Sequence, residues 1–121
     1  ESEAVRRWSA AVDSYDGYVF VTAEYNHGVP GAFKNAVDSL GPEWVGKAVA
    51  FVSYGADAGV RAVEHWRQIV TNFSMVDVRA QVSLRRFEEF DAAASVQPNA
   101  RRAGELTALF EQLESAIARQ G

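Results

Sequence analysis

The sequence predicts an α/β domain built on a parallel β-sheet. Helical and extended patterns alternate along the chain, beginning and ending with a helix, which is the order expected of a sheet with crossover helices. Two strands, Tyr18–Thr22 and Lys47–Tyr54, are apolar almost throughout, as expected of parallel strands that are covered on both faces. A third strand, Val76–Val82, alternates apolar and polar residues, which indicates a position nearer an edge.

Four segments have the three- and four-residue apolar spacing of helices that pack on one face. Pro30 fits the first turn of the second helix, because a helix start leaves its N–H groups without an internal acceptor. The predicted apolar faces are Ala4/Val5, Trp8, Val12 and Tyr15 for the helix Glu3–Ser14; Phe33, Ala36/Val37 and Leu40 in Pro30–Leu40; Ala62, Val63, Trp66, Ile69, Val70 and Phe73 after Gly59; and Ala103, Leu106, Phe110, Leu113 and Ile117 in the helix that begins near Pro98.

One connection is unusually long. It runs over residues 83–97 between the third strand and the last helix, and it holds Phe87 and Phe90. Long connections in compact domains are often functional or interfacial. We therefore expect this one to contribute to a binding surface or to contacts between subunits.

Composition narrows the class of protein. The 121 residues are enough for one domain, and a net charge of -4 argues against a nucleic-acid or anionic-membrane partner. The absence of cysteine from the sequence excludes a disulfide framework and a thiolate metal site. With no apolar run long enough to span a bilayer, we expect a cytoplasmic protein.

Two loops of the predicted sheet should meet. Right-handed crossovers place the two apolar strands side by side, so the loops that follow them, Ala23–Gly28 and Ser53–Gly59, converge at the same edge. Ligands of open parallel sheets bind beyond the carboxyl ends of the strands. The sequence therefore predicts a ligand cleft between these loops.

The stretch from Thr22 to Asp38 is the most specific feature of the chain. It reads Thr-Ala-Glu-Tyr-Asn-His-Gly-Val-Pro-Gly-Ala-Phe-Lys-Asn-Ala-Val-Asp. It resembles the Thr-Pro-Glu-Tyr-Asn…Pro…Lys-Asn-Ala-(Ile/Val)-Asp signature of the NADPH-dependent FMN reductase family, whose members are flavodoxin-like quinone, azo-dye and chromate reductases. Ala23 stands where the family has proline, which should leave the loop softer.

The resemblance implies a flavodoxin-like three-layer α/β/α fold. It also implies FMN as cofactor, NADPH or NADH as co-substrate, and a small-molecule electron acceptor such as a quinone, a flavin or an azo compound. The positions that it assigns to flavin contact are Glu24, Tyr25, Asn26 and His27 in the first loop, and Ser53, Gly55 and Gly59 in the second. Because the cofactor carries the chemistry, we assign no catalytic side chain and no metal site.

The resemblance covers about the C-terminal two-thirds of the family domain. The family's first two strands, first helix and Gly-Ser-x-Arg-x-x-Ser type phosphate loop have no counterpart in residues 1–121. We therefore expect a fragment, a processed chain, or a protein whose first part lies elsewhere. The strand Tyr18–Thr22 should then have an open edge, which would make the isolated chain marginal as a monomer.

Several features have an alternative interpretation. His27 and Glu24 could together bind a metal, but they would need further ligands. Arg85–Arg86 and Arg101–Arg102 could attract the 2′-phosphate of a nicotinamide dinucleotide, although we expect solvated faces. For the helical aromatic residues Trp8, Trp66 and Phe73, core packing and dimer contact are both plausible.

Three functions are compatible with the sequence. The preferred one is a flavin-dependent NAD(P)H oxidoreductase that works as a homodimer or homotetramer. The absent phosphate loop motivates the second, a flavin-free interaction module, because the FMN phosphate requires clustered N–H donors. The third is an electron carrier of flavodoxin type, which the lack of a strongly acidic face disfavours.

Overall fold

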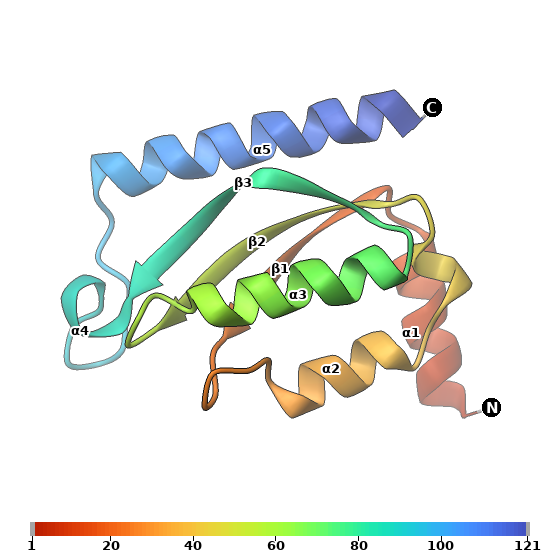
Figure 1. Ribbon diagram of the computed structural model, residues 1–121, viewed down its shortest axis with the longest axis horizontal. Coiled ribbons are helices and arrows are strands. Elements are labelled where there is room, and N and C mark those ends of the chain that lie inside the picture. The colour runs from red at the N-terminus through yellow and green to blue at the C-terminus, as the bar shows by residue number, and fades with distance from the viewer. Residues whose placement is uncertain (1, 121) are drawn as a thin grey trace.

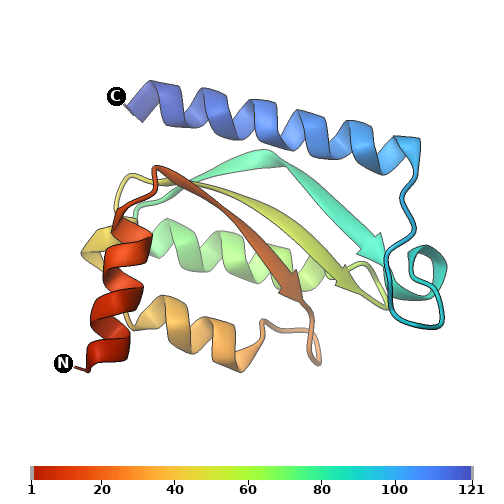
Figure 2. The same ribbon diagram turned by 180° about the vertical axis from the view of Figure 1, so that it is seen from behind.

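The structure is a computed structural model that describes residues 2–120. Its three parallel strands lie in the order β1 (Gly17–Ala23), β2 (Ala48–Gly55) and β3 (Val76–Arg85). The other elements are α1 (Glu3–Asp13), α2 (Gly31–Asp38), the short 3-10 turn η1 (Pro42–Trp44), α3 (Val60–Asn72), α4 (Arg86–Glu89) and α5 (Ala100–Gln120). Figures 1 and 2 show α5 on one face of the sheet and α2 and α3 on the other. The predicted α/β architecture is confirmed.

The central strand β2 is buried on both faces, which explains its continuous apolar sequence. Ala48 to Phe51 are completely inaccessible to solvent. Their side chains point alternately to the two faces, so Val49 and Phe51 join the core under α3, whereas Ala48 and Ala50 join the core under α5.

The core on the α2–α3 side is aromatic and centres on Phe20 of β1. Four rings surround it at centroid distances from 5.0 to 5.9 Å, those of Phe33, Trp44, Phe51 and Trp66. Trp66 of α3 also donates from Nε1 to the buried Thr22 Oγ1, at 3.1 Å. Because Thr22 directly precedes the last residue of β1, this bond fixes α3 relative to the start of the following loop.

The first helix is shorter than the sequence suggested. It ends at Asp13, and Ser14 is its C-cap. Val12 is buried and Trp8 packs against the core, but Tyr15 is exposed, so its predicted burial is wrong. Position 15 lies beyond the helix and no longer follows helical spacing.

The last helix uses a different face from the one predicted. Leu109, Leu113 and Ala116 are its buried residues, and they pack on the side of the sheet formed by small residues such as Ala48 and Ala50. The predicted burial of Ala103, Leu106 and Phe110 is wrong, since all three are exposed. Leu113 belongs both to the predicted face and to the buried face. Ala48 and Ala50 let the helix approach the sheet closely, which favours the face with Leu109 and Ala116.

The long connection predicted over residues 83–97 is partly regular. Strand β3 continues to Arg85, α4 follows, and Phe90 pairs with Val96 in an isolated antiparallel bridge. Arg102 of α5, which the sequence suggested was solvated, is largely buried and forms ion pairs with Glu89 and Glu105. It therefore attaches the connection to the last helix.

The two edges of the sheet differ. In β3, a register shift forms a bulge whose backbone is bound by side chains: Arg67 donates to the carbonyls of Val78 and Arg79, and Gln112 accepts from the Ala80 N–H. Strand β1 pairs only with β2 in the part of the chain that the structure describes, and its Val21 side chain is 60% exposed. This is the open edge expected from the sequence, and its effect on solubility stays a prediction.

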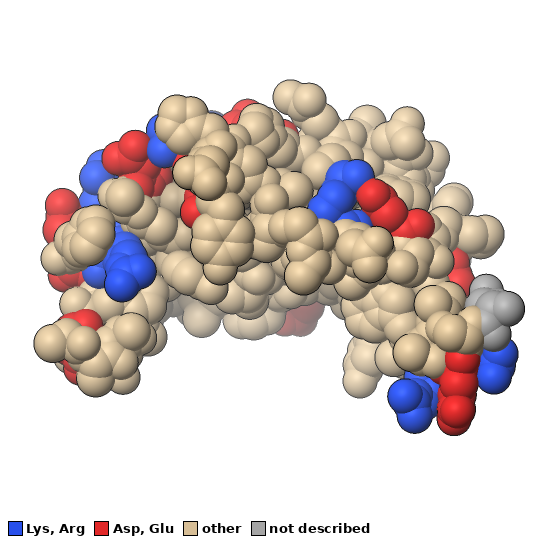
Figure 3. Space-filling view, turned by 90° about the horizontal axis from the view of Figure 1, so that it is seen from below, with Lys and Arg blue, Asp and Glu red and all other residues tan. Residues whose placement is uncertain are grey.

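Charged side chains are spread over the surface in mixed groups. Seen from below, the larger charged clusters contain both basic and acidic residues, and most of that face is uncharged (Figure 3). Lys34 and Asp38, for example, form an ion pair along α2. Across residues 2–120, no helix is both long and apolar enough to cross a lipid bilayer.

Candidate functional site

The two predicted loops lie side by side. Ala23 at the end of β1 pairs with Tyr54 of β2, so the chain leaves both strands at the same edge of the sheet, as Figures 1 and 2 show. Parallel sheets place their ligands at this edge.

The first loop contains a tight turn. The backbone N–H of Tyr25 donates to the Gly28 carbonyl and the Gly28 N–H donates to the Tyr25 carbonyl, both at 3.0 Å. Asn26 and His27 have φ of 50° and 68°, which is the geometry of a type I′ turn. The side chains of Tyr25, Asn26 and His27 are all exposed. The turn therefore presents an exposed aromatic ring next to the exposed residues Asn26 and His27.

Glu24 links the first loop to helix α3. One carboxylate oxygen accepts from the backbone N–H groups of Arg61 and Ala62 at 3.0 and 3.2 Å, and the other accepts from Arg61 Nε at 2.6 Å. Side-chain hydrogen bonds from Arg61 to Asp57 and to Glu24 raise the pKa of Arg61. Glu24 therefore acts as an N-terminal cap for α3, a role that sequence reasoning missed.

The carboxylate of Glu24 is committed to these bonds, so it is not paired with His27 at a metal site. Among residues 2–120, no group of three or more His, Cys, Asp or Glu is placed to hold a metal ion.

The predicted residues of the second loop shape it from within. Ser53 is completely buried, and its hydroxyl donates to the Ala58 carbonyl at 2.7 Å. Gly59 has a φ of +74°, and a Cβ atom there would lie 2.8 Å from Ser53 Cβ. Gly55 lies against Gly59, with 3.4 Å between its would-be Cβ and the Gly59 nitrogen. These three residues hold the chain in a compact turn.

The loops leave hydrogen-bond donors without an internal acceptor. The backbone N–H groups of Asn26, His27, Ala56 and Asp57 have no acceptor in the described part of the chain. The first amides of α3, by contrast, are bound by Glu24, so this helix start offers little to a phosphate. The site can bind the polar edge of a planar ring through backbone donors.

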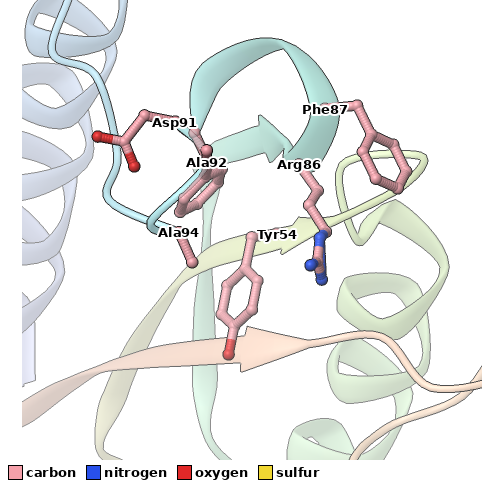
Figure 4. A pocket seen from close by; sticks show the side chains of 7 residues that line it. Tyr54, Arg86, Phe87, Asp91, Ala92 and Ala94 are labelled. Carbon is pink, nitrogen blue, oxygen red and sulfur yellow. The ribbon is translucent and has the colours of Figure 1, made fainter.

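A pocket lies beside Tyr54, the residue that precedes Gly55 of the second loop. It has a volume of about 590 Å³ and is lined by Tyr54, by Arg86 and Phe87 of α4, by Phe90 and Asp91, and by two alanines of the following turn. In Figure 4, Tyr54 and Arg86 extend in the same direction, whereas the Asp91 carboxylate points to the opposite side. Sequence reasoning did not assign Tyr54 to the site; the available signal was a tyrosine at the end of an apolar strand.

Comparison with known families decides the ancestry of the chain. The family model described as NADPH-dependent FMN reductase matches residues 1–89, which is well over half of the 121 residues. The chain belongs to the NADPH-dependent FMN reductase family. The resemblance seen between Thr22 and Asp38 is thereby confirmed.

Curated relatives in this family carry related names. An NAD(P)H-dependent FMN reductase of Nectria sp is 58% identical over 60 residues, which cover 50% of this chain and 30% of the relative. The NAD(P)H-dependent FMN reductase of Saccharomyces cerevisiae is 41% identical over 70 residues, with 58% and 37% covered. A quinone reductase of Escherichia coli is 46% identical over 61 residues, with 46% and 32% covered. The matched part is thus about a third of each relative's length.

Solved structures confirm the flavodoxin-like fold of this FMN reductase family member. The flavoenzyme NAD(P)H:(acceptor) oxidoreductase FerB of Paracoccus denitrificans superposes with a TM-score of 0.80 at 22% identity, covering 99% of this chain and 70% of FerB. An oxidoreductase of Corynebacterium diphtheriae superposes with a TM-score of 0.79 at 18% identity, covering 100% of this chain and 65% of that protein.

Proposed function

We propose that this family member works as an FMN-dependent NAD(P)H oxidoreductase in which Tyr25–His27 and Gly55–Gly59 hold the flavin ring. The observation that carries the proposal is the pairing of Ala23 with Tyr54, which sets an exposed aromatic turn beside a glycine turn. Membership in the FMN reductase family and the names of the curated relatives support the same cofactor.

The residues present fit one end of FMN. The pyrimidine edge of the flavin carries carbonyl oxygens and ring nitrogens, which require donors such as the free N–H groups of Asn26, His27, Ala56 and Asp57. The Tyr25 ring supplies a flat apolar wall. Since Glu24 occupies the start of α3, these loops accommodate the ring and leave the phosphate to another part of the protein.

FMN held by these loops would supply two-electron transfer from NADPH or NADH to an acceptor such as a quinone, a flavin or an azo compound. The role of this chain's residues is to bind the flavin and to orient it. Glu24 and Arg61 hold the two loops together, and Ser53 closes the second turn on itself. No side chain is required as a general acid or base, so we assign none.

We also propose an oligomeric state and a cellular location for the protein. Val21, Leu106 and Phe110 are exposed apolar side chains, which are suitable for contacts between subunits, so we propose a homodimer or homotetramer. We propose the cytoplasm as its location, because a chain without cysteine needs no oxidising compartment to fold.

The test compares two tyrosines that are equally exposed. Tyr25 and Tyr15 are both 63% exposed, but only Tyr25 lies at the proposed flavin site. We expect purified protein to show flavin absorbance, to oxidise NADPH with a quinone, and to lose FMN affinity by about tenfold in Tyr25→Ala. Tyr15→Ala should retain wild-type affinity.

The alternatives give different results. Colourless protein that takes up no added FMN would overturn the proposal in favour of an interaction module. Flavin-bound protein with slow NADPH oxidation and fast one-electron exchange would indicate a carrier. Equal FMN affinity in Tyr25→Ala and Tyr15→Ala would contradict the site.

A further inference from the structure

The pocket beside Tyr54, here called the aromatic pocket, has three aromatic side chains in its lining. The Tyr54 and Phe90 rings lie 6.1 Å apart at an interplanar angle of 53°. Phe87 on α4 is 80% exposed, an unusual state for phenylalanine. The volume of about 590 Å³ is within the range of sites that bind small molecules.

The pocket also holds a positive charge that the protein does not neutralise. The arginines near it have carboxylate partners: Arg85 pairs with Glu88, Arg101 with Glu105, and Arg102 with both Glu89 and Glu105. Arg86 has no ion pair with any residue from 2 to 120. Its guanidinium lies 5.6 Å from the centroid of the Phe87 ring, so the cation is placed beside an aromatic wall.

The one acidic residue that lines the pocket does not compensate Arg86. Asp91 accepts from the backbone N–H groups of Ala93 and Ser95, both at 2.9 Å, and from Gln97 Nε2 at 3.1 Å. In Figure 4 its carboxylate points away from Arg86. The Asp91 carboxylate is thus bound by the turn and forms no ion pair with Arg86.

The wall that carries Arg86 is held in place. Glu89 accepts from Arg102 Nε and Nη2 at 2.7 and 2.9 Å and from the Arg85 N–H at 2.7 Å. The same segment is closed by the bridge between Phe90 and Val96. A site that is formed before its ligand arrives loses less free energy on binding.

We propose that the aromatic pocket binds a co-substrate that combines a planar aromatic ring with an anionic group. The ring packs among Tyr54, Phe87 and Phe90, and a phosphate, sulfonate or carboxylate binds Arg86, whose fork of donors matches such groups. Two sources have this chemistry: the 2′-phosphoadenosine end of NADPH and an anionic aromatic acceptor. The inference rests on the proposed function, since Tyr54 directly precedes the glycine turn assigned to the flavin.

The experiment measures binding by isothermal titration calorimetry with matched pairs of probes. Adenosine 2′,5′-bisphosphate is compared with AMP, and 1,4-naphthoquinone-2-sulfonate with 1,4-naphthoquinone. We expect one anionic probe to bind more tightly than its matched partner, and Arg86→Gln to weaken that probe by about tenfold. Arg85→Gln, which removes the same charge one position away and outside the pocket lining, should bind as wild type. The probe that responds identifies the source.

The proposal is overturned if neither anionic probe binds better than its partner, or if Arg86→Gln and Arg85→Gln weaken it equally. FMN affinity is measured on the same samples from flavin absorbance, and it should be unchanged in both variants. Protein that binds the anionic probe through Arg86 but takes up no FMN would refute the proposed function and leave the pocket standing. Normal FMN binding, combined with anionic-probe binding that does not depend on Arg86, would refute the pocket proposal and leave the proposed function standing.

Discussion

Glu24 and Arg61 join the two loops of the candidate site through both backbone and side chain. The Glu24 carboxylate accepts from the Arg61 N–H at 3.0 Å and from Arg61 Nε at 2.6 Å. Glu24 follows the last residue of β1, and Arg61 lies in the first turn of α3. The spacing between the Tyr25 turn and the glycine turn is therefore set by one acidic side chain, of which only 7% is exposed.

Replacing Glu24 with glutamine should destabilise the fold. Glutamine keeps one acceptor oxygen but loses the charge and one of the paired bonds, which should lower the free energy of unfolding by about 1–3 kcal/mol. Chemical denaturation measures the loss. Asp57→Asn is the control, because Asp57 contacts the same arginine from a side chain that is 62% exposed. Equal losses in the two variants would contradict the capping role.

A methyl group at Gly59 should distort the second loop. The residue has positive φ, and the added Cβ would lie 2.8 Å from Ser53 Cβ and 3.0 Å from two backbone atoms of Tyr54. We expect Gly59→Ala to lose at least about 1 kcal/mol of stability and to weaken FMN binding. Gly104→Ala is the control, since a Cβ there meets nothing within 4 Å, and it should stabilise α5 by about 0.5–1 kcal/mol. A stable Gly59→Ala variant with normal FMN affinity would refute the assigned geometry.

Two adjacent residues of α5 test which face of the helix is buried. Leu109 is completely buried and Phe110 is 44% exposed. Leu109→Ala should cost about 2–5 kcal/mol through the lost contacts and the cavity left behind. Phe110→Ala should cost no more than about 1 kcal/mol. Thermal or urea unfolding of both variants decides the point, and a larger loss at Phe110 would show that the helix is rotated.

Stability should depend on Glu89 in a defined pH range. Hydrogen bonding to Arg102 lowers the pKa of Glu89 from its ordinary value of 4.5 to about 2. Because the pKa is lower in the folded state, the stabilisation is fully present above pH 4.5 and is lost as the pH falls toward 2.

Comparison with Glu89→Gln isolates this effect. At neutral pH the variant should be less stable by about 1–3 kcal/mol, because the bidentate pair with Arg102 is broken. The difference between the two proteins should shrink as the pH falls below 4.5. A difference that stays constant down to pH 3 would show that the pair does not carry the stabilisation.

The parallel sheet and the meeting of the loops could be predicted from the sequence, because burial on both faces requires apolar strands. Tyr18–Thr22 and Lys47–Tyr54 have that pattern, and right-handed crossovers left one simple arrangement for them. The resulting pairing of Thr22 with Ser53 and of Ala23 with Tyr54 follows directly.

The burial of α5 could not be predicted, because its sequence carries two overlapping apolar stripes. Leu113 belongs to both, and spacing alone does not rank Leu109 above Phe110. The choice depends on Ala48 and Ala50, which lie far away in sequence and allow the helix to approach the sheet. A local sequence pattern does not identify a packing partner that lies so far away in the chain.

The meeting of the two loops was predicted from the sequence, whereas the contacts of their side chains were predicted only in part. Tyr25, Asn26 and His27 are exposed at the sheet edge, as a ligand contact requires. Glu24 and Ser53 are instead committed to internal hydrogen bonds, because a cap or a turn is formed with residues that the local sequence does not identify. Arg86 was recognised only as one of several arginines, and its lack of an ion pair depends on where the neighbouring glutamates lie.

The most direct test of the flavin site is the response of its backbone amides to FMN. Two-dimensional NMR of the isotope-labelled protein, recorded during an FMN titration, reports each N–H separately. We expect the largest shifts at Asn26, His27, Ala56 and Asp57, and little change at Arg61 and Ala62, because Glu24 already binds the amides of these two. Saturable FMN binding that leaves the amides of residues 25–28 and 55–59 unmoved would contradict it.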